Sequence, residues 1–169
     1  MSKSIKFKKS LILKRIIFLL MLITAFYVIF NFSAQDGELS GSISRKVTSF
    51  IVEILSKVKN MDTNLKLHYI EKLHPFIRKL AHFSIYTAVG FSIMGFMCTF
   101  NIRNIFKFFT SICIGATYAI TDEIHQSFIP GRGPSVIDVC IDSAGVLTGV
   151  FIMILIIVLI ESITNWINR

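Results

Sequence analysis

The sequence predicts an all-α, polytopic membrane protein with four transmembrane helices and an amphipathic helix in the loop after the first of them. Two observations predict this fold class. Hydrophobic residues make up 53% of the 169 positions, giving a mean hydropathy of +0.68, and four apolar runs are long enough to cross a bilayer. We place these spans at about residues 12–32, 80–100, 105–124 and 136–160 of a single membrane domain, residues 1–169.

The first span follows a basic tail that carries six of the 18 Lys and Arg residues. A secretory signal begins in a similar way, but residues 16–32 are long for its apolar region. In addition, Phe32 before Ser33 and Ala34 makes a poor small-residue cleavage site. We therefore expect a retained membrane anchor.

The polar interval after this span contains one segment with helical periodicity, residues 42–58. Its apolar side chains repeat at helical spacing with basic residues between them, which is typical of an amphipathic helix that lies on the membrane or caps the bundle. A loop helix that is solvated on one side and packs its apolar face inward fits the same pattern. Pro75 predicts that the next helix starts close to it.

The third span, residues 105–124, is short for a bilayer, so we expect it to use residues 121–124 and to let Lys107 extend its ammonium group to the interface. The three cysteines, Cys98, Cys113 and Cys140, have no close spacing. Neither a disulfide framework nor a CxxC metal site is therefore predicted.

The net charge of +8 fits membrane topology better than nucleic-acid binding, because the basic residues lie beside the predicted spans. With an inside N-terminus, nine basic residues fall on each side of the membrane. The basic cluster next to the first span breaks this tie, and every acidic residue except Glu161 falls on the other side. We expect both termini to be cytoplasmic.

A polar stretch, residues 121–149, lies between two apolar runs. It holds four of the ten acidic residues, Asp122, Glu123, Asp138 and Asp142. A charge at the bilayer centre costs roughly 2.5–3.5 kcal/mol on an insertion scale, so four acids facing lipid would cost on the order of 10 kcal/mol. They must lie at the interface or in a shared polar pocket, which is a functional-site hypothesis.

Polar side chains gather at three helix ends that the predicted topology places on the outer side. They are Lys79, His82 and Tyr86 at i, i+3, i+7; Asp122 and Gln126 at i, i+4, beside Glu123; and Asp138 and Asp142 at i, i+4. Side chains at these spacings share a helix face. Gly145 and Gly149 continue the last face and allow a neighbouring helix to approach closely, which would bring these acids near it.

This pattern resembles the VanZ family, named for the teicoplanin-resistance protein of glycopeptide-resistant bacteria. The matching pieces are Phe32-Ser33-x-Gln35, Lys79-x-x-His82-Phe83-x-x-Tyr86, Asp122-Glu123-x-x-Gln126, Pro130-Gly131-Arg132 and Asp138-x-x-x-Asp142-x-x-Gly145-x-x-x-Gly149. Position 142 departs from the pattern, since we expect Asn there; Asp142 adds a negative charge that would change the proton balance of the pocket. The resemblance implies a small multi-pass protein of the bacterial cytoplasmic membrane and, for its namesake, low-level resistance to a lipid-tailed glycopeptide.

Each candidate site residue has a structural alternative. The candidate catalytic residues are His82, Asp122 and Glu123, and the candidate ligand-binding residues are Lys79, Tyr86, Gln126, Arg132, Asp138 and Asp142. Yet His82 also suits helix packing. Asp122 and Glu123 suit the end of the third span at the interface, and Arg132 suits a clamp on Asp138 or Asp142.

A metal site built from His82, His125, Asp122 and Glu123 is disfavoured, because no HExxH-type spacing is present. We expect neither a metal nor a cofactor.

Three functions remain open. The first is a non-catalytic membrane factor that contributes to glycopeptide or lipoglycopeptide resistance, or to envelope homeostasis, by binding a lipoglycopeptide or a lipid-linked wall precursor in the polar pocket. The second is a membrane-embedded enzyme that acts on an outer-leaflet lipid or lipid-linked wall precursor by acid–base chemistry. The third, a proton or ion path, is disfavoured because no inverted repeat is visible and the polar groups cluster on one side. Membrane lipid is the expected partner, and the oligomeric state does not follow from the sequence.

Overall fold

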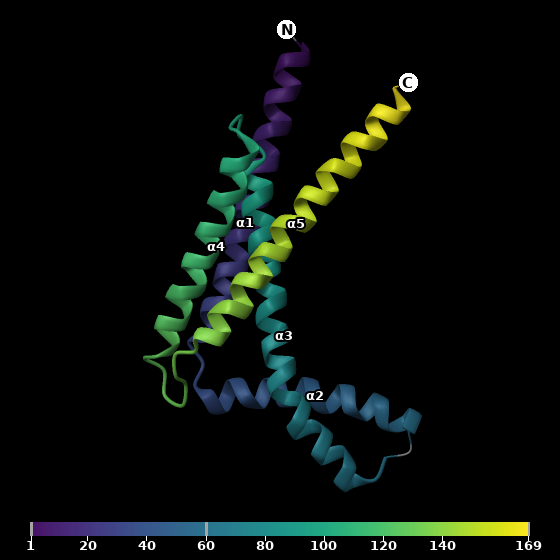
Figure 1. The fold of residues 1–169 in the computed structure, drawn as a ribbon, viewed down its shortest axis with the longest axis vertical. Coiled ribbons are helices and arrows are strands. Elements are labelled where there is room, and N and C mark those ends of the chain that lie inside the picture. Colours follow the sequence, from purple (N-terminus) through teal and green to yellow (C-terminus); the bar gives the residue numbers. More distant parts are fainter. Residues whose placement is uncertain (1, 60, 169) are drawn as a thin grey trace.

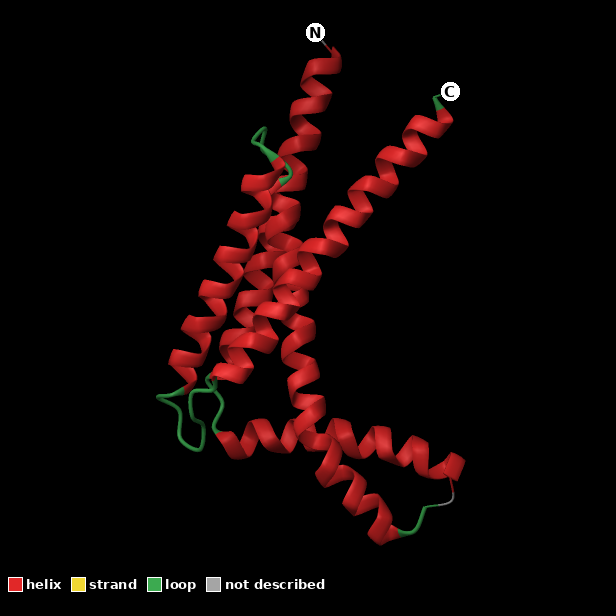
Figure 2. Ribbon diagram, viewed as in Figure 1, coloured by secondary structure: helices red, strands yellow, loops and turns green. Residues whose placement is uncertain are grey.

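A computed structural model describes residues 2–59 and 61–168 of the chain (Figure 1). This part of the chain is all-helical and contains no strand, which confirms the all-α part of the predicted fold class (Figure 2). The helices are α1 (Ser2–Ser33), α2 (Gly37–Lys59), α3 (Thr63–Met97), α4 (Asn104–Gln126) and α5 (Val136–Ile167). Four of them, α1, α3, α4 and α5, form a bundle in which chain neighbours run in opposite directions, and both termini lie at the same end (Figure 1).

The central helix is α3, which contacts each of the other four helices and packs most extensively on α5. Glycines make this packing close. A Cβ at Gly90 would collide with the backbone of Val146, and one at Gly149 would collide with the backbone of Thr87 and Phe91. The close approach that the spacing of Gly145 and Gly149 predicts therefore exists, and its partner is α3.

A hydrophobic core lies directly beneath the polar end of the bundle. Its buried members come from four helices: Ala25, Ile29, Tyr86, Val89, Ile93, Ala119 and Val146. Because interiors pack densely, this core fixes how α3, α4 and α5 are rotated against one another. It thereby sets which side chains face each other at the helix ends.

The amphipathic segment is a helix, α2, and it runs across the direction of the bundle at the end opposite the termini (Figure 1). Thr48 and Val52 on one face of α2 are buried, and α2 packs on α3. The large apolar side chains Val47, Phe50 and Ile54 stay exposed. Inward packing therefore accounts for Val52 but not for these three exposed side chains, whose exposure is compatible with contact with a lipid surface.

The start of α3 differs from the prediction. The helix begins at Thr63, well before Pro75, because the Asp62 side chain accepts a hydrogen bond from the Leu65 amide (2.8 Å) and caps its first turn. Pro75 lies inside the helix. A proline there removes the one backbone hydrogen bond that its missing N–H would make, and the turns before and after it carry the helix through.

Three helices are long and apolar enough to cross a membrane, α1 from Lys8, α3 and α5. Of the four predicted spans, α4 does not meet this measure, because Lys107 and the acidic residues at its end lower its mean hydropathy. Large hydrophobic side chains such as Phe30, Phe109 and Leu155 are exposed around the bundle. Such a surface is stable in contact with lipid and not in water.

Candidate functional site

Three helix segments meet at the end of the bundle opposite the termini. They are the middle of α3, the last turns of α4 and the first turns of α5 (Figure 1). The loop between α4 and α5 makes this possible. Gly131 adopts a left-handed conformation (φ +74°), which glycine tolerates without strain. Ser135 then caps α5 by accepting a hydrogen bond from the Asp138 amide (3.2 Å).

These ends enclose a polar pocket of about 380 Å³. Its lining includes most of the residues that sequence spacing singled out, with additions from the loop and from the start of α3. The lining residues are His74, Pro75, Arg78, Lys79, His82, Glu123, Gln126, Gly131, Arg132, Gly133, Asp138, Ile141 and Asp142. The pocket has the volume of a small-molecule site.

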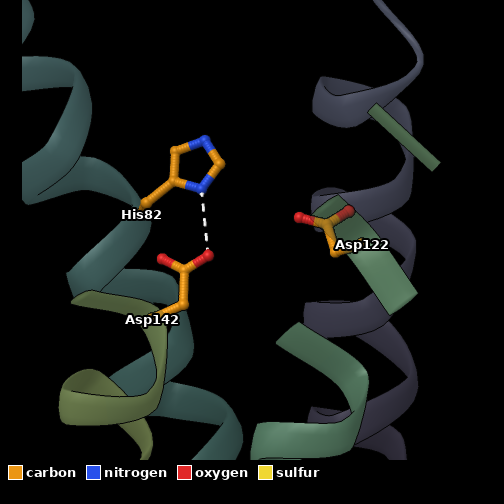
Figure 3. Close-up of side chains that lie close together, drawn as sticks. All are labelled: His82, Asp122 and Asp142. Atoms are coloured by element: carbon orange, nitrogen blue, oxygen red, sulfur yellow. Dashed lines mark ion pairs between the residues drawn. The ribbon is translucent and has the colours of Figure 1, made fainter. Parts of the chain in front are cut away.

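His82 and Asp142 face each other at the base of this pocket, and Asp122 points toward them from α4 (Figure 3). His82 Nδ1 lies 3.6 Å from Asp142 Oδ2. One ligand-type atom from each of the three residues lies within 4.8 Å of the others. The set of residues able to hold a cation is therefore His82, Asp122 and Asp142, and it differs from the set weighed in the sequence analysis.

Asp122 belongs to a hydrogen-bonded group that joins α1 to α4. Ser33 Oγ donates to Asp122 Oδ1 (2.6 Å), and Gln126 Nε2 donates to Asp122 Oδ2 (3.1 Å) and to Ser33 Oγ (3.3 Å). All three side chains are buried. Bonds to a charged acceptor are strong, so this group fixes the orientation of the Asp122 carboxylate.

Glu123 is buried and forms a hydrogen bond with a backbone amide. Its Oε2 accepts a hydrogen bond from the Ser135 amide (2.7 Å), which ties α4 to the start of α5. The neighbouring His125 stacks on Phe30, with ring centroids 5.1 Å apart. Neither residue joins the His82 group, which is why the four-residue metal set weighed in the sequence analysis is not assembled.

Two basic residues at the rim have protein partners. Lys79 Nζ lies 2.9 Å from Asp138 Oδ1. Arg132 does not clamp Asp138 or Asp142; it donates instead to the carbonyl oxygens of Phe32 (2.9 Å) and Ser33 (3.4 Å) and caps the end of α1.

Burial lowers the pKa of the Arg132 guanidinium from its ordinary value, and the charge of Arg78 adds to this, while Asp122 and Glu123 act in the opposite direction. Arginine nevertheless keeps its proton at physiological pH. Arg132 therefore contributes a positive charge to the pocket wall as well as a cap to α1.

Tyr86 lies beneath the pocket and is fully buried. Its hydroxyl faces the Asp122 and Asp142 carboxylates, yet it makes no hydrogen bond within the described part of the chain. Its ring lies near that of Tyr118, with centroids 6.2 Å apart.

Sequence spacing brought together the correct helix faces and missed two partners. Ser33, at the last turn of α1, bonds Asp122 although no spacing rule links positions 89 residues apart. The available signal was its place in the Phe32-Ser33-x-Gln35 motif at the end of an apolar run. The other missed partner is the backbone amide of Ser135, because backbone donors carry no residue-type signal.

Comparison with known proteins identifies a family. A family model described as VanZ/LLP1 matches residues 18–158, which is most of the chain and includes all the helix ends of the pocket. No curated protein and no solved structure matches the chain significantly.

Proposed function

The chain belongs to the VanZ/LLP1 family, and from this premise we propose that it is a membrane factor that binds an amphiphile with an anionic polar part in its pocket. The amphiphile is a lipid-tailed glycopeptide of the teicoplanin type or a lipid-linked wall precursor, and binding lowers drug action at the membrane or maintains the envelope. The resemblance of the residue pattern to the teicoplanin-resistance protein motivates the choice of ligand.

The observation that carries this proposal is the junction of a polar and an apolar cavity. An apolar groove of about 320 Å³ lies between α1, α2 and α3, with Val28, Ile43 and Ile77 among its lining residues. Arg78 and His82 line both this groove and the polar pocket. A ligand with a polar part and an acyl chain matches this arrangement, because each part finds a surface of its own kind.

Arg78 is the residue that favours an anionic polar part. Its guanidinium forms no hydrogen bond or ion pair with any described residue, whereas Lys79 and Arg132 at the same pocket have protein partners. A guanidinium binds phosphate and carboxylate groups through two parallel hydrogen bonds. An unpaired Arg78 at the junction is thus suited to hold such a group.

A second candidate function, an enzyme acting on an outer-leaflet lipid or lipid-linked wall precursor, is favoured by the facing pair of His82 and Asp142. Both residues line the pocket and lie 3.6 Å apart. A histidine paired with a carboxylate is a common general acid or base. Glu123 is less suited to this role than the sequence suggested, because one of its oxygens accepts the Ser135 amide.

The test compares cells that express the wild type, Arg78→Gln or Lys57→Gln at matched membrane levels. Lys57 is an exposed cation on α2 outside the pocket. Teicoplanin sensitivity, lipid extracts and wall precursors are measured in parallel. We expect Arg78→Gln to lose protection with unchanged extracts and Lys57→Gln to retain it. A molecule that appears or vanishes only with the wild type would establish the enzyme instead, and equal protection in both variants would contradict an anion-binding role for Arg78.

We further propose that α4 is a fourth span and that both termini are cytoplasmic. Because α3 ends at the terminal end of the bundle and α5 starts at the opposite end, α4 must cover the same distance (Figure 1). Its 23 residues extend about 35 Å, enough for a hydrocarbon layer of about 30 Å. Its acids do not oppose this, since Asp122 and Glu123 are buried against the other helices.

This arrangement is tested by labelling single cysteines with a membrane-impermeant maleimide in a chain freed of its own cysteines. Asn101 lies in the exposed α3–α4 connection, and a side chain fits at Gly133 in the α4–α5 loop. We expect Gly133→Cys to react in intact cells and Asn101→Cys only after permeabilisation. Labelling of both from the same side would contradict the fourth span, and the reverse pattern would contradict the orientation.

A further inference from the structure

We propose that His82, Asp122 and Asp142 bind one divalent transition-metal ion, of the type that Zn²⁺ and Mn²⁺ represent, at the base of the polar pocket. This site does not depend on the amphiphile proposed above. It rests on three features: the geometry of the donor atoms, a buried carboxylate without donors, and a supporting shell around a second carboxylate.

The donor atoms lie close to the spacing of metal ligands. His82, Asp122 and Asp142 come from α3, α4 and α5, and one atom of each lies within 4.8 Å of the others. His82 Nδ1 and Asp142 Oδ2 are 3.6 Å apart. Two atoms at ~2.1 Å from a common ion subtend roughly 115–120° at that separation, close to tetrahedral or trigonal geometry. Since two ligand atoms on one such ion lie at most about 4.2 Å apart, a bound ion would draw the three atoms closer together.

Asp142 is the unusual member. It is 0% exposed, and neither of its carboxylate oxygens accepts a hydrogen bond within the described part of the chain. A buried carboxylate without donors is strongly unfavourable, and buried charges are found paired or bound to metals. The atom that faces it most closely, His82 Nδ1, also lacks a hydrogen bond. The two atoms face each other (Figure 3), and a cation bound between them would give each of them a partner.

Asp122 has the surroundings of an oriented ligand. Ser33 donates to one of its oxygens and Gln126 to the other, and a carboxylate oxygen that accepts one hydrogen bond keeps a second lone pair for a metal. Metal-binding carboxylates are typically held in this way by outer groups. Ser33 and Gln126 are therefore positioning residues in this proposal.

The charges around the site call for a cation as well. No Lys or Arg of the described chain forms an ion pair with Asp122 or Asp142, since Lys79 pairs with Asp138 and Arg132 bonds the end of α1. Two carboxylates and one imidazole leave a net negative charge at the base of the pocket. A nitrogen ligand beside carboxylates favours Zn²⁺ or Mn²⁺ over Mg²⁺ and Ca²⁺, which prefer oxygen ligands alone. The pocket itself gives the ion access to His82 and Asp142.

The test uses the untagged, full-length protein in detergent, stripped of metal and titrated with Zn²⁺ by calorimetry and with Co²⁺ by visible absorption. We expect one ion per chain and a Co²⁺ spectrum of low coordination number. Asp142→Asn and His82→Gln should weaken binding at least 100-fold, and Gln126→Ala about 10–100-fold, as expected for an outer group. Glu161→Gln is the matched control, because Glu161 is an exposed acid on the same helix and lies outside both the pocket and the ligand set.

A second measurement guards against variants that fail to fold. Thermal unfolding with and without Zn²⁺ should show stabilisation of the wild type and of Glu161→Gln, and none for Asp142→Asn, whose metal-free form should unfold no earlier than the metal-free wild type. Binding of less than one ion per chain by the wild type would overturn the proposal and leave a proton as the compensating charge. Undiminished binding by Asp142→Asn would overturn it too, because the ion would then bind elsewhere.

Discussion

The two ends of the bundle differ in where their buried serines donate hydrogen bonds. Near the termini, Ser92 and Ser111 donate to backbone carbonyls four residues earlier in their own helices, at 2.7 Å each. At the pocket end, Ser33 donates across helices to Asp122, and Glu123 accepts from the backbone of the next helix. Asp142 has no hydrogen bond with any described residue.

This difference separates two kinds of stability in one protein. A hydroxyl that bonds its own helix hides its polarity and leaves the helix free to pack by shape, as in lipid-embedded bundles. A bond between helices fixes their relative rotation and depth. The pocket end is accordingly held by several polar contacts between helices, while at the other end Arg15 of α1 bonds Thr99 (3.1 Å) and α5 leans away from α1 (Figure 1). Groups whose satisfaction is incomplete, such as Asp142, are concentrated where binding is proposed.

The largest effect should come from breaking the packing that both ends share. Gly149→Leu places a side chain against the Thr87 and Phe91 backbone and forces α5 away from α3. We expect a loss of about 3 kcal/mol or more, or no folded protein, seen as early thermal unfolding and aggregation in detergent. Gly41→Ala is the control, since nothing lies near its added methyl group and alanine favours a helix. Equal loss in both would contradict the role of close α3–α5 contact.

The difference between the two ends of the bundle is tested most directly at two serines that are each 1% exposed, Ser33 and Ser92. Ser33→Ala removes a donor from the buried Asp122 carboxylate and should cost about 1–3 kcal/mol, because a buried acceptor loses its partner. Ser92→Ala should change stability by less than about 0.5 kcal/mol, because the Ala88 carbonyl that Ser92 bonded still accepts a backbone hydrogen bond within α3. Thermal unfolding of the two variants side by side decides this. Similar costs would show that the two ends do not differ.

A smaller effect is expected from Arg132→Lys. Lysine keeps the charge but loses the planar fork that reaches two carbonyl oxygens at the end of α1. We expect destabilisation of about 1 kcal/mol, measured by thermal unfolding, whereas Arg45→Lys on the exposed face of α2 should be neutral. An unchanged Arg132→Lys variant would mean that charge alone, without the forked contact, holds the loop to α1.

The smallest effect should follow removal of the rim ion pair. The side chains of Lys79 and Asp138 are 43% and 34% exposed, so water and salt screen their attraction. A double-mutant cycle of Lys79→Gln and Asp138→Asn should give a coupling of at most about 0.5 kcal/mol that declines with added salt. A coupling above 1 kcal/mol would place this pair with the tightly held contacts of the pocket instead of at its solvated rim.

The sequence predicted which helix faces form the candidate site, but not which groups pair with one another there. Lys79, His82 and Asp142 all line the pocket, as their spacing on α3 and α5 predicted. The clamp considered for Arg132 was wrong, because its partners are carbonyl groups of α1. Backbone acceptors look alike at every position, so no pattern in the sequence singles them out.

The sequence by itself determined what each helix presents: apolar surfaces long enough for lipid, an amphipathic α2, and acids gathered at particular helix ends. These follow from periodicity along a single chain segment. Only the tertiary structure decided that Asp142 faces His82, that Asp122 is held by Ser33, and that α3 begins at Thr63 and continues through Pro75. The physical reason is that a partner on another helix depends on relative rotation and depth. Here those are set by the glycine contacts between α3 and α5, which act between segments far apart in the chain.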